Sequence, residues 1–175
     1  LCVALAFMTL PIVAIFVGLV ALVLSALMRL QLGFPDQFHF VEPSQYYQFI
    51  TMHGIIMVIY LLTALFLGGF GNYLIPLMVG ARDMAFPYVN MLSYWVYLLA
   101  VIILLASFFV PGGPTGAGWT LYPPQAVLPG TPGAGWGIIL MLVSLGTFIV
   151  AFTMGGLNYV TTVLQARCQG MTLMR

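Results

Sequence analysis

Residues Tyr46–Val79 read YYQFITMHGIIMVIYLLTALFLGGFGNYLIPLMV and contain no charged side chain. An α-helix crosses the apolar core of a bilayer with about 20 apolar residues, so this segment is long enough for one crossing that tilts or extends beyond the hydrocarbon. The glycine cluster Gly68–Gly71 predicts the close approach of a neighbouring helix. Pro76 predicts a kink or the end of the helix. The segment therefore predicts one long transmembrane helix.

Composition extends this prediction to the whole chain. Of the 175 residues, 63% are hydrophobic and 4% are charged, whereas a soluble domain contains about 25% charged residues. No internal repeat and no domain boundary divides residues 1–175. Three more stretches meet the length requirement. The predicted fold is therefore all-α, a polytopic membrane helix bundle with transmembrane helices at about 2–30, 46–79, 89–110 and 135–164.

Charge and cysteine content argue against two other classes of protein. The net charge of +1 gives no reason to expect a nucleic-acid partner. Cys2 and Cys168 lie near opposite ends of the chain without a CxxC pair, so they predict two buried apolar thiols. Neither a disulfide framework nor a zinc site is indicated.

The charged residues in the loops predict the topology. Arg82 lies between the second and third helices, and Arg167 and Arg175 follow the fourth. Positive residues favour the cytoplasmic side, which places both termini and the 80–88 loop inside. The loop at 111–134 then faces outward, and its prolines and central aromatic residues predict a shaped cap at least as readily as a flexible linker.

His53 is the most informative residue within a predicted helix. An ionisable side chain inside a membrane is costly and is functional by default, and a neutral imidazole can ligate a metal. Two interpretations remain open: a cofactor ligand, or an interhelical hydrogen bond. In the first, Gly54 leaves room for a flat cofactor, and the helical neighbours of His53 cradle it: Phe49, Ile56, Met57 and Tyr60.

Two further residues on the outer side bear on the same site. Arg29 ends the first helix, where it either extends to the membrane interface or reaches a polar edge of whatever His53 binds. His39 lies in the outer loop and is expected to be solvated rather than a ligand.

A second group of polar residues gathers towards the inner side. Asp83 in the inner loop is explained either by ordinary loop polarity or by the uptake of protons from the cytoplasm. Amide and hydroxyl side chains above it hold ordered water, and polar chains of this kind inside a membrane are typical of proton routes. The residues of this predicted wet path are Asn72, Asn90, Ser93, Ser144 and Asn158.

Several motifs carry a resemblance to a known family. They are GGFGNYLIPLMVGARDMAFP at 68–87, GWTLYPP at 118–124 and, more loosely, LNYVTT at 157–162 and GMT at 170–172. The chain resembles the first four helices of subunit I of the haem–copper oxidases, especially the cytochrome c oxidase branch with the D-type proton channel. Subunit I in that family has about twelve transmembrane helices, so the resemblance implies the N-terminal portion of a longer subunit.

The resemblance implies a role for each singled-out residue. His53 looks like an axial ligand of the low-spin haem, Arg29 like the arginine that hydrogen-bonds the formyl group of haem A, and Trp119 and Tyr122 like the loop residues near the haem propionates. Asp83 matches the aspartate at the channel mouth, and the asparagines and serines named above match channel residues. The high-spin haem and copper would be held by the rest of the complete subunit.

The sequence also departs from the family pattern. Ala151 and Phe152 stand where two channel serines are expected, and Leu10 replaces a tyrosine near the channel. These changes imply a different upper part of the water path. Gln31 replaces a glutamate of a calcium or sodium site, which puts that site in doubt.

A second departure concerns the electron donor. Quinol-oxidising relatives carry an arginine and an aspartate where this chain has Val20 and Leu24, although Gln48 does match their pattern. The balance favours cytochrome c over a quinol.

The function implied by the resemblance is that of a terminal respiratory oxidase, which reduces oxygen to water and pumps protons. The expected partners are other oxidase subunits, the rest of subunit I, cytochrome c and membrane lipid. The bacterial cytoplasmic membrane is favoured over the mitochondrial inner membrane. A quinol oxidase of the same superfamily and a proton-coupled transporter without haem remain the alternatives. The transporter predicts an inverted repeat, and the chain shows none.

Overall fold

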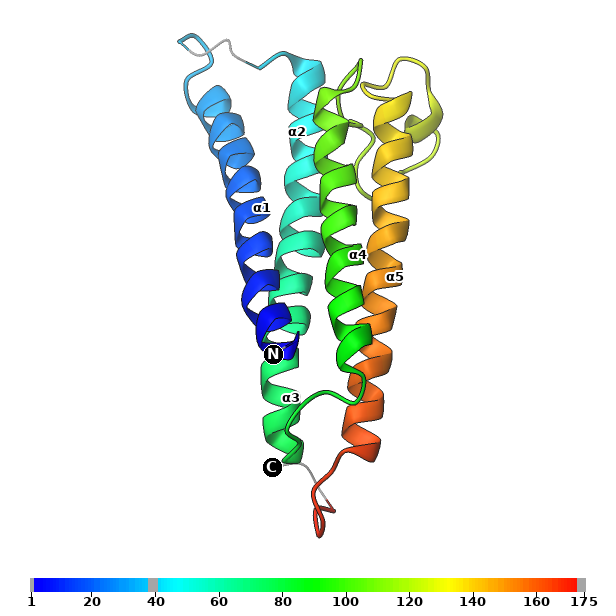
Figure 1. Ribbon diagram of the computed structural model, residues 1–175. Coiled ribbons are helices and arrows are strands. Elements are labelled where there is room, and N and C mark those ends of the chain that lie inside the picture. Colours follow the sequence, from blue (N-terminus) through cyan, green and yellow to red (C-terminus); the bar gives the residue numbers. More distant parts are fainter. Residues whose placement is uncertain (1, 38–40, 173–175) are drawn as a thin grey trace.

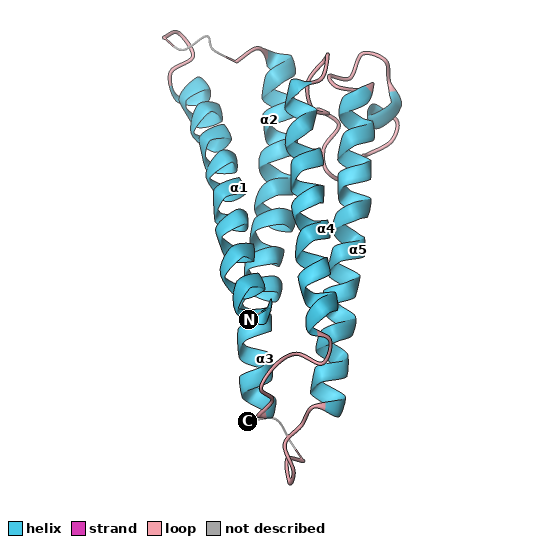
Figure 2. Ribbon diagram, in the orientation of Figure 1, coloured by secondary structure: helices cyan, strands magenta, loops and turns pink. Residues whose placement is uncertain are grey.

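The computed structural model describes residues 2–37 and 41–172, with side chains from Thr9 onward. In this part of the chain all regular structure is helical, as Figure 2 shows. Four long helical segments stand side by side and alternate in direction (Figure 1). The all-α prediction is confirmed, and each segment is long and apolar enough to cross a membrane. His39 lies outside the described residues, so its predicted solvation stays a prediction.

The second segment is one continuous helix with a change of pitch. It begins as an α-helix, continues with wider π-helical turns, in which hydrogen bonds join residues five apart, and ends as an α-helix. The Thr63 hydroxyl shows the same five-residue spacing, because it donates to the carbonyl of Val58. The bounds of all elements are α1 Cys2–Gly33, α2 Pro43–Ile55, η1 Ile56–Gly71, α3 Asn72–Val79, α4 Pro87–Ala106, η2 Ser107–Phe109, η3 Gln125–Val127 and α5 Trp136–Gln165.

Proline and glycine set the ends of the helices. Pro43 and Pro87 each lie in the first turn of a helix, where the missing N–H of proline costs nothing. Pro76 lies inside α3 without ending it, and the helix runs on to Val79. Gly80 then ends it with a φ of 74°, a left-handed conformation that glycine adopts without strain.

Close packing between α1 and η1 depends on glycine. A Cβ atom added to Gly68 would lie 2.8 Å from a methyl carbon of Leu10, and one added to Gly69 would lie 3.0 Å from the ring of Pro11. These distances are too short for a larger residue without movement of the neighbour. The prediction that the glycine cluster admits a neighbouring helix is confirmed, and the neighbour is α1.

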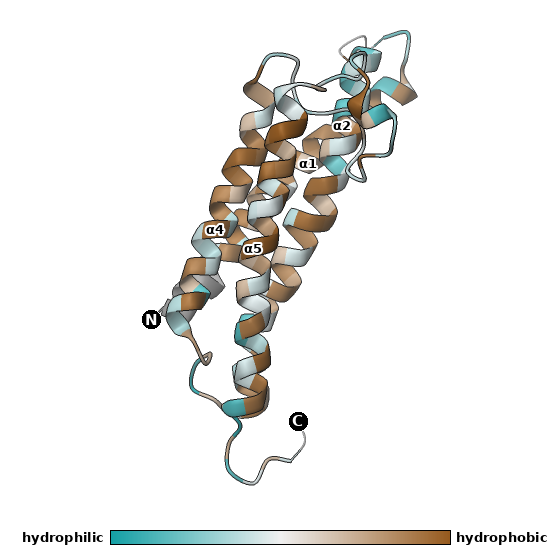
Figure 3. Ribbon diagram, turned by 90° about the vertical axis from the view of Figure 1, so that its right-hand side faces the viewer, coloured by the Kyte–Doolittle hydropathy of each residue, from teal (hydrophilic) through white to brown (hydrophobic). Residues whose placement is uncertain are grey.

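The bundle buries a core between its helices and exposes apolar side chains outside. Tyr60, Met52, Leu104 and Met141 are fully buried among the four segments. Figure 3 shows hydrophobic residues along the middle of the helices and more hydrophilic residues at both ends. This pattern is the one that a bilayer selects.

The loops divide between the two ends of the bundle. The connection from α1 to α2 and the long connection from α4 to α5 lie at one end (Figure 1). The connection from α3 to α4 lies at the other end, near the end of α5. Cys168 lies after α5 and is exposed, which contradicts its prediction as a buried thiol. Its backbone N–H donates to the carbonyl of Val79, so the segment that carries it is held against the surface of α3.

The long connection from α4 to α5, named the outer loop after the side predicted for it, is a folded cap. Residues 114–117 are buried, and the N–H of Gly116 donates to the carbonyl of Pro132 at 2.8 Å. A Cβ atom on Gly137 would lie 2.3 Å from the carbonyl oxygen of Gly113, so the loop backbone packs directly on the start of α5. The structure therefore favours the shaped cap over the flexible linker.

Candidate functional site

His53 lies on α2 and is tied to α1 by one ring nitrogen. Its Nδ1 is 2.9 Å from the carbonyl oxygen of Ala21, which is fully buried. A carbonyl oxygen only accepts hydrogen bonds, so Nδ1 is the donor, and an imidazole in the corresponding tautomer has its lone pair on Nε2. No hydrogen bond to Nε2 is found in the described part of the chain. The interhelical bond and the ligand role, which the sequence left as alternatives, are therefore compatible.

The surroundings of His53 differ from the predicted cradle. Ile56 and Tyr60 are fully buried in the bundle core, so they do not line an open face beside the imidazole. Phe49 and Met57 pack against the core with part of their surface exposed. His53 itself is partly exposed. Only two of the four predicted neighbours are thus available to contact a flat cofactor.

Trp119 of the outer loop reaches the turn that carries His53. A Cβ atom on Gly54 would lie 3.7 Å from Cδ1 of the Trp119 indole, which is ordinary van der Waals contact. The space beside Gly54 that was predicted to admit a cofactor is therefore covered by Trp119. Tyr122, which follows in the same loop, is 73% exposed.

Arg29 is exposed on α1, eight residues beyond Ala21. At 1.5 Å per residue it stands about 12 Å further along the helix axis, towards the end of the bundle where the α4–α5 connection lies (Figure 1). No ion pair to Arg29 is found within residues 2–37 and 41–172. Its guanidinium is thus available for a group outside the described structure.

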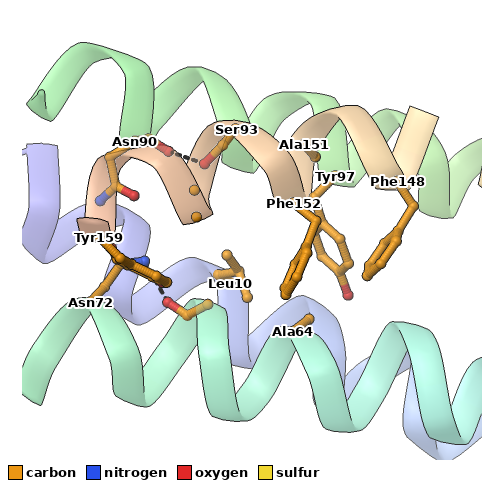
Figure 4. A pocket seen from close by; sticks show the side chains of 13 residues that line it. Leu10, Ala64, Asn72, Asn90, Ser93, Tyr97, Phe148, Ala151, Phe152 and Tyr159 are labelled. Carbon is orange, nitrogen blue, oxygen red and sulfur yellow. Dashed lines mark hydrogen bonds between the residues drawn. The ribbon is translucent and has the colours of Figure 1, made fainter. Parts of the chain in front are cut away.

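A cavity lies between the helices below His53, with about 40 Å³ of space for the centres of water molecules. Two fully buried polar atoms at this cavity have no hydrogen-bond partner: Oδ1 of Asn72 and Nδ2 of Asn90. A buried water needs roughly 10–15 Å³ by this measure and two to four polar partners. One unpaired acceptor and one unpaired donor beside such a space are suited to ordered water. Figure 4 shows both asparagines at one end of the cavity.

The other end of the cavity is apolar. Phe148 and Phe152 stack there with ring centroids 5.9 Å apart and an interplanar angle of 11° (Figure 4). Leu10, Ala151 and Phe152, the three positions near the predicted channel at which the sequence departs from the family pattern, all line the cavity. These three departures therefore gather in one place and make the cavity less polar beyond the asparagines.

The two predicted channel serines have different surroundings. Ser93 lines the cavity, and its hydroxyl donates to the carbonyl of Asn90 at 2.7 Å. Ser144 is fully buried outside the cavity lining. Its hydroxyl donates to the carbonyl of Ala100 at 2.6 Å, so it accepts its second bond, at 2.5 Å, from the hydroxyl of Tyr60. Ser144 thus joins three helices and leaves no donor for a water chain.

Asn158 holds the loop that carries Asp83. Its Oδ1 accepts from the N–H of Phe86 at 2.9 Å, and its Nδ2 donates to the carbonyl of Phe86 at 3.1 Å. The neighbouring Thr162 hydroxyl accepts from the N–H of Ala85. Asp83 is partly exposed, and its Oδ1 accepts from the N–H of Met84 at 2.7 Å. The asparagine therefore anchors the loop instead of lining the cavity.

This anchoring predicts a local loss of stability in Asn158→Ala. The change leaves the N–H of Phe86 without its acceptor, at a cost of about 1–3 kcal/mol, while the Phe86 carbonyl keeps its bond from the N–H of Asn90. Hydrogen exchange at residues 83–86 is expected to rise about tenfold or more. The control is Thr161→Ala, at a partly exposed residue whose hydroxyl donates to the carbonyl of Leu157 in its own helix. Equal exchange in both variants would show that Asn158 does not hold the loop.

The sequence alone did not single out Thr51 or Tyr97. Thr51 accepts a hydrogen bond from the outer loop, and Tyr97 lines the cavity while its hydroxyl donates to the carbonyl of Tyr60. A threonine or tyrosine in a membrane helix is common, and nothing in the local sequence shows whether its hydroxyl bonds its own helix or a distant segment.

Several known proteins are similar to this chain over most of its length. The chain is 81% identical over 91% of its length to "Alternative cytochrome c oxidase subunit 1" of Bradyrhizobium diazoefficiens, of which it covers 27%. It is 40% identical over 87% to "Heme-copper oxidase subunit I+III" of Aeropyrum pernix, covering 18% of that protein. It is 38% identical over 90% to "Cytochrome c oxidase subunit 1" of Eremothecium gossypii, covering 29%.

The chain spans less than a third of the length of these relatives. The model of one family, described as cytochrome c and quinol oxidase polypeptide I, matches residues 5–175. The resemblance inferred from the motifs is confirmed by this match. Since it covers almost all of the sequence, the chain belongs to the cytochrome c and quinol oxidase polypeptide I family.

Proposed function

We propose that the chain is the N-terminal transmembrane portion of a terminal oxidase subunit I that reduces oxygen to water and pumps protons. In this role His53 is one axial ligand of the low-spin haem, and the Asp83 loop with the asparagine cavity takes up protons. The single observation that carries the proposal is the bond from Nδ1 of His53 to the carbonyl of Ala21, because it leaves Nε2 free inside a membrane helix.

The residues present fit a haem ligand. A histidine that ligates a metal usually donates its other ring N–H to a carbonyl or carboxylate, which fixes the tautomer and the ring orientation. Haem iron held there would supply one-electron transfer. Arg29 is available to hydrogen-bond the formyl edge of haem A, and Trp119 and Tyr122 lie on the outer side, where the propionates are expected. The high-spin haem and copper belong to the remainder of the complete subunit.

Proton uptake is proposed to begin at Asp83 and continue through water held between Asn72 and Asn90. The unpaired amide atoms of the two asparagines support this part, and Ser93 adds a hydroxyl beside them. We assign Asn158 and Ser144 to the support of the path, since their polar atoms bond protein groups. Phe152 lies at the apolar end of this proposed route.

Cytochrome c is the proposed electron donor. Gln48, the one residue that matches the quinol-oxidising pattern, is buried, and its Nε2 donates to the carbonyl of Gly112 at 2.6 Å. This bond supports a role in holding the outer loop rather than in binding a quinol. We further propose other oxidase subunits as partners, a bacterial cytoplasmic membrane as the location, and both termini on the cytoplasmic side.

Oxygen consumption by the purified complex tests this function. The complex is expected to consume oxygen with reduced cytochrome c and to be at least about tenfold slower with ubiquinol at equal concentration. Faster consumption with the quinol would favour the quinol oxidase alternative. Complete inactivity with both donors, in a complex of intact composition, would contradict the oxidase assignment.

A further inference from the structure

Two polar residues of α2 hold the outer loop at separate points. Nε2 of Gln48 donates to the carbonyl of Gly112, and Oγ1 of Thr51 accepts from the N–H of Gly118 at 3.0 Å. Thr51 is 2% exposed, so water does not compete for this bond. The Thr51 hydroxyl donates its own proton to the carbonyl of Tyr47, which directs a lone pair of its oxygen to the loop.

The loop segment that Thr51 binds also touches the same helix one turn further along the chain. Gly118 has a φ of 83°, which turns the chain sharply, and the next residue is Trp119. The indole of Trp119 then lies over Gly54, because a Cβ atom added there would be 3.7 Å from its Cδ1. Thr51, Gly118, Trp119 and Gly54 therefore form a closed circuit of contacts, and His53 lies within the helical turn that this circuit encloses.

The side chain of His53 is held by a hydrogen bond on the opposite side of α2. Thr51 and His53 are two residues apart, which separates them by about 200° around the helix axis. The hydrogen bond from Gly118 to Thr51 constrains one side of the turn, and the carbonyl of Ala21 holds the imidazole on the other side. A ligand must be held to within about 0.5 Å and 10–20° by its supporting residues, and this turn is constrained from both sides.

We propose that Thr51 is a positioning residue for His53. By binding Gly118 it seats Trp119 on Gly54 and so fixes the turn that presents Nε2 of the histidine. The inference rests on the proposed role of His53 as a haem ligand. It extends that role by assigning the orientation of the ligand to a hydroxyl that contacts neither the imidazole nor a cofactor.

A simpler role for Thr51 is to satisfy a loop amide and nothing more. In that case its removal would loosen the loop and leave the haem signature unchanged. The two roles are separated by measuring hydrogen exchange in the loop and the midpoint potential and electron paramagnetic resonance spectrum of the low-spin haem in the same purified complex.

The test uses Thr51→Val, which keeps the shape of the side chain and removes the hydroxyl. Exchange in peptides covering residues 112–122 is expected to rise about tenfold, because a buried N–H loses its acceptor. The low-spin haem is expected to remain bound with a shifted midpoint potential and altered resonance positions. Thr51→Ser keeps the hydroxyl and should match the native complex within about twofold in exchange, with a native haem signature.

Thr147→Val is the matched control. The Thr147 hydroxyl donates to the carbonyl four residues earlier, as Thr51 does, but Thr147 is partly exposed on α5 and has no described bond to the outer loop. This variant should leave both readouts unchanged. A shift of equal size would show that the effect is a general consequence of losing a hydroxyl in a membrane helix, and would overturn the proposal.

The remaining outcomes are also decisive. Native exchange in Thr51→Val would show that the bond does not hold the loop, and a loosened loop with a native haem signature would limit Thr51 to the loop. Should Thr51→Val fail to assemble, a Thr51→Ser complex with a loosened loop or a shifted haem would overturn the proposal. A wild-type complex without low-spin haem would instead overturn the proposed function, while the exchange data would still report on the bond.

Discussion

His53→Leu is expected to abolish the low-spin haem signal and to lower oxygen consumption by more than about 100-fold. Leucine has no nitrogen that could ligate a metal. The change therefore removes Nε2, the ring nitrogen that is not bonded to the carbonyl of Ala21. Even residues that only orient a metal ligand cost 10–100-fold when they are changed, and the loss of the ligand itself should cost more. The measurement is the reduced-minus-oxidised spectrum of the purified variant complex, together with its haem content.

The control for this prediction is His39→Leu, the same change at the only other histidine of the sequence. It should retain the low-spin haem. A native low-spin band in His53→Leu would remove His53 as a ligand and leave it with its interhelical bond alone. A complex that loses both haems and its subunits would point to failed assembly, which the subunit composition of the same sample reveals.

Asp83→Asn is expected to slow turnover about tenfold or more and to abolish proton pumping while haem content stays native. The asparagine side chain keeps an oxygen that can accept from the N–H of Met84, so the loop should keep its conformation. It loses the carboxylate that takes up and releases protons, and a positioned proton-transfer group contributes typically 10²–10⁴-fold to a rate. Oxygen consumption and acidification by reconstituted vesicles measure both effects.

Asp36→Asn supplies the comparison for Asp83. It makes the same change of charge and size at an exposed residue in the connection between α1 and α2, at the other end of the bundle. Turnover and pumping should be native in this variant. If Asp83→Asn also pumped at the native ratio and turned over normally, protons would have to enter elsewhere.

The helices could be predicted from the sequence because a bilayer requires long apolar runs, and such runs are visible without an alignment. The predicted ends of the helices were less accurate than their number and approximate positions. The first helix was expected to stop near Leu30, where polar residues begin, yet it continues to Gly33, since a helix need not end where the hydrocarbon does. The wide turns of η1 could not be predicted from the sequence. A π-helix differs from an α-helix in the spacing of its backbone hydrogen bonds, which no residue pattern here indicates.

The candidate site was predictable in part. His53 could be found because an ionisable group in a membrane helix needs a reason, and Asn72 and Asn90 were recognisable as buried polar groups, which the structure places at one cavity. The bonds of Asn158 and Ser144 could not be foreseen, since an amide or hydroxyl binds backbone or water equally well. The contact of Trp119 with Gly54 joins segments far apart in sequence, so only the folded loop reveals it.

The central claim is that this chain helps hold a haem in an oxygen-reducing complex. It is tested most directly by a reduced-minus-oxidised optical spectrum of the native complex, recorded with and without carbon monoxide. We predict a low-spin haem band that carbon monoxide leaves unchanged, beside a second haem whose band shifts. A complex of intact composition that shows no haem band would contradict the account and favour a transporter-like membrane protein in which His53 only joins two helices.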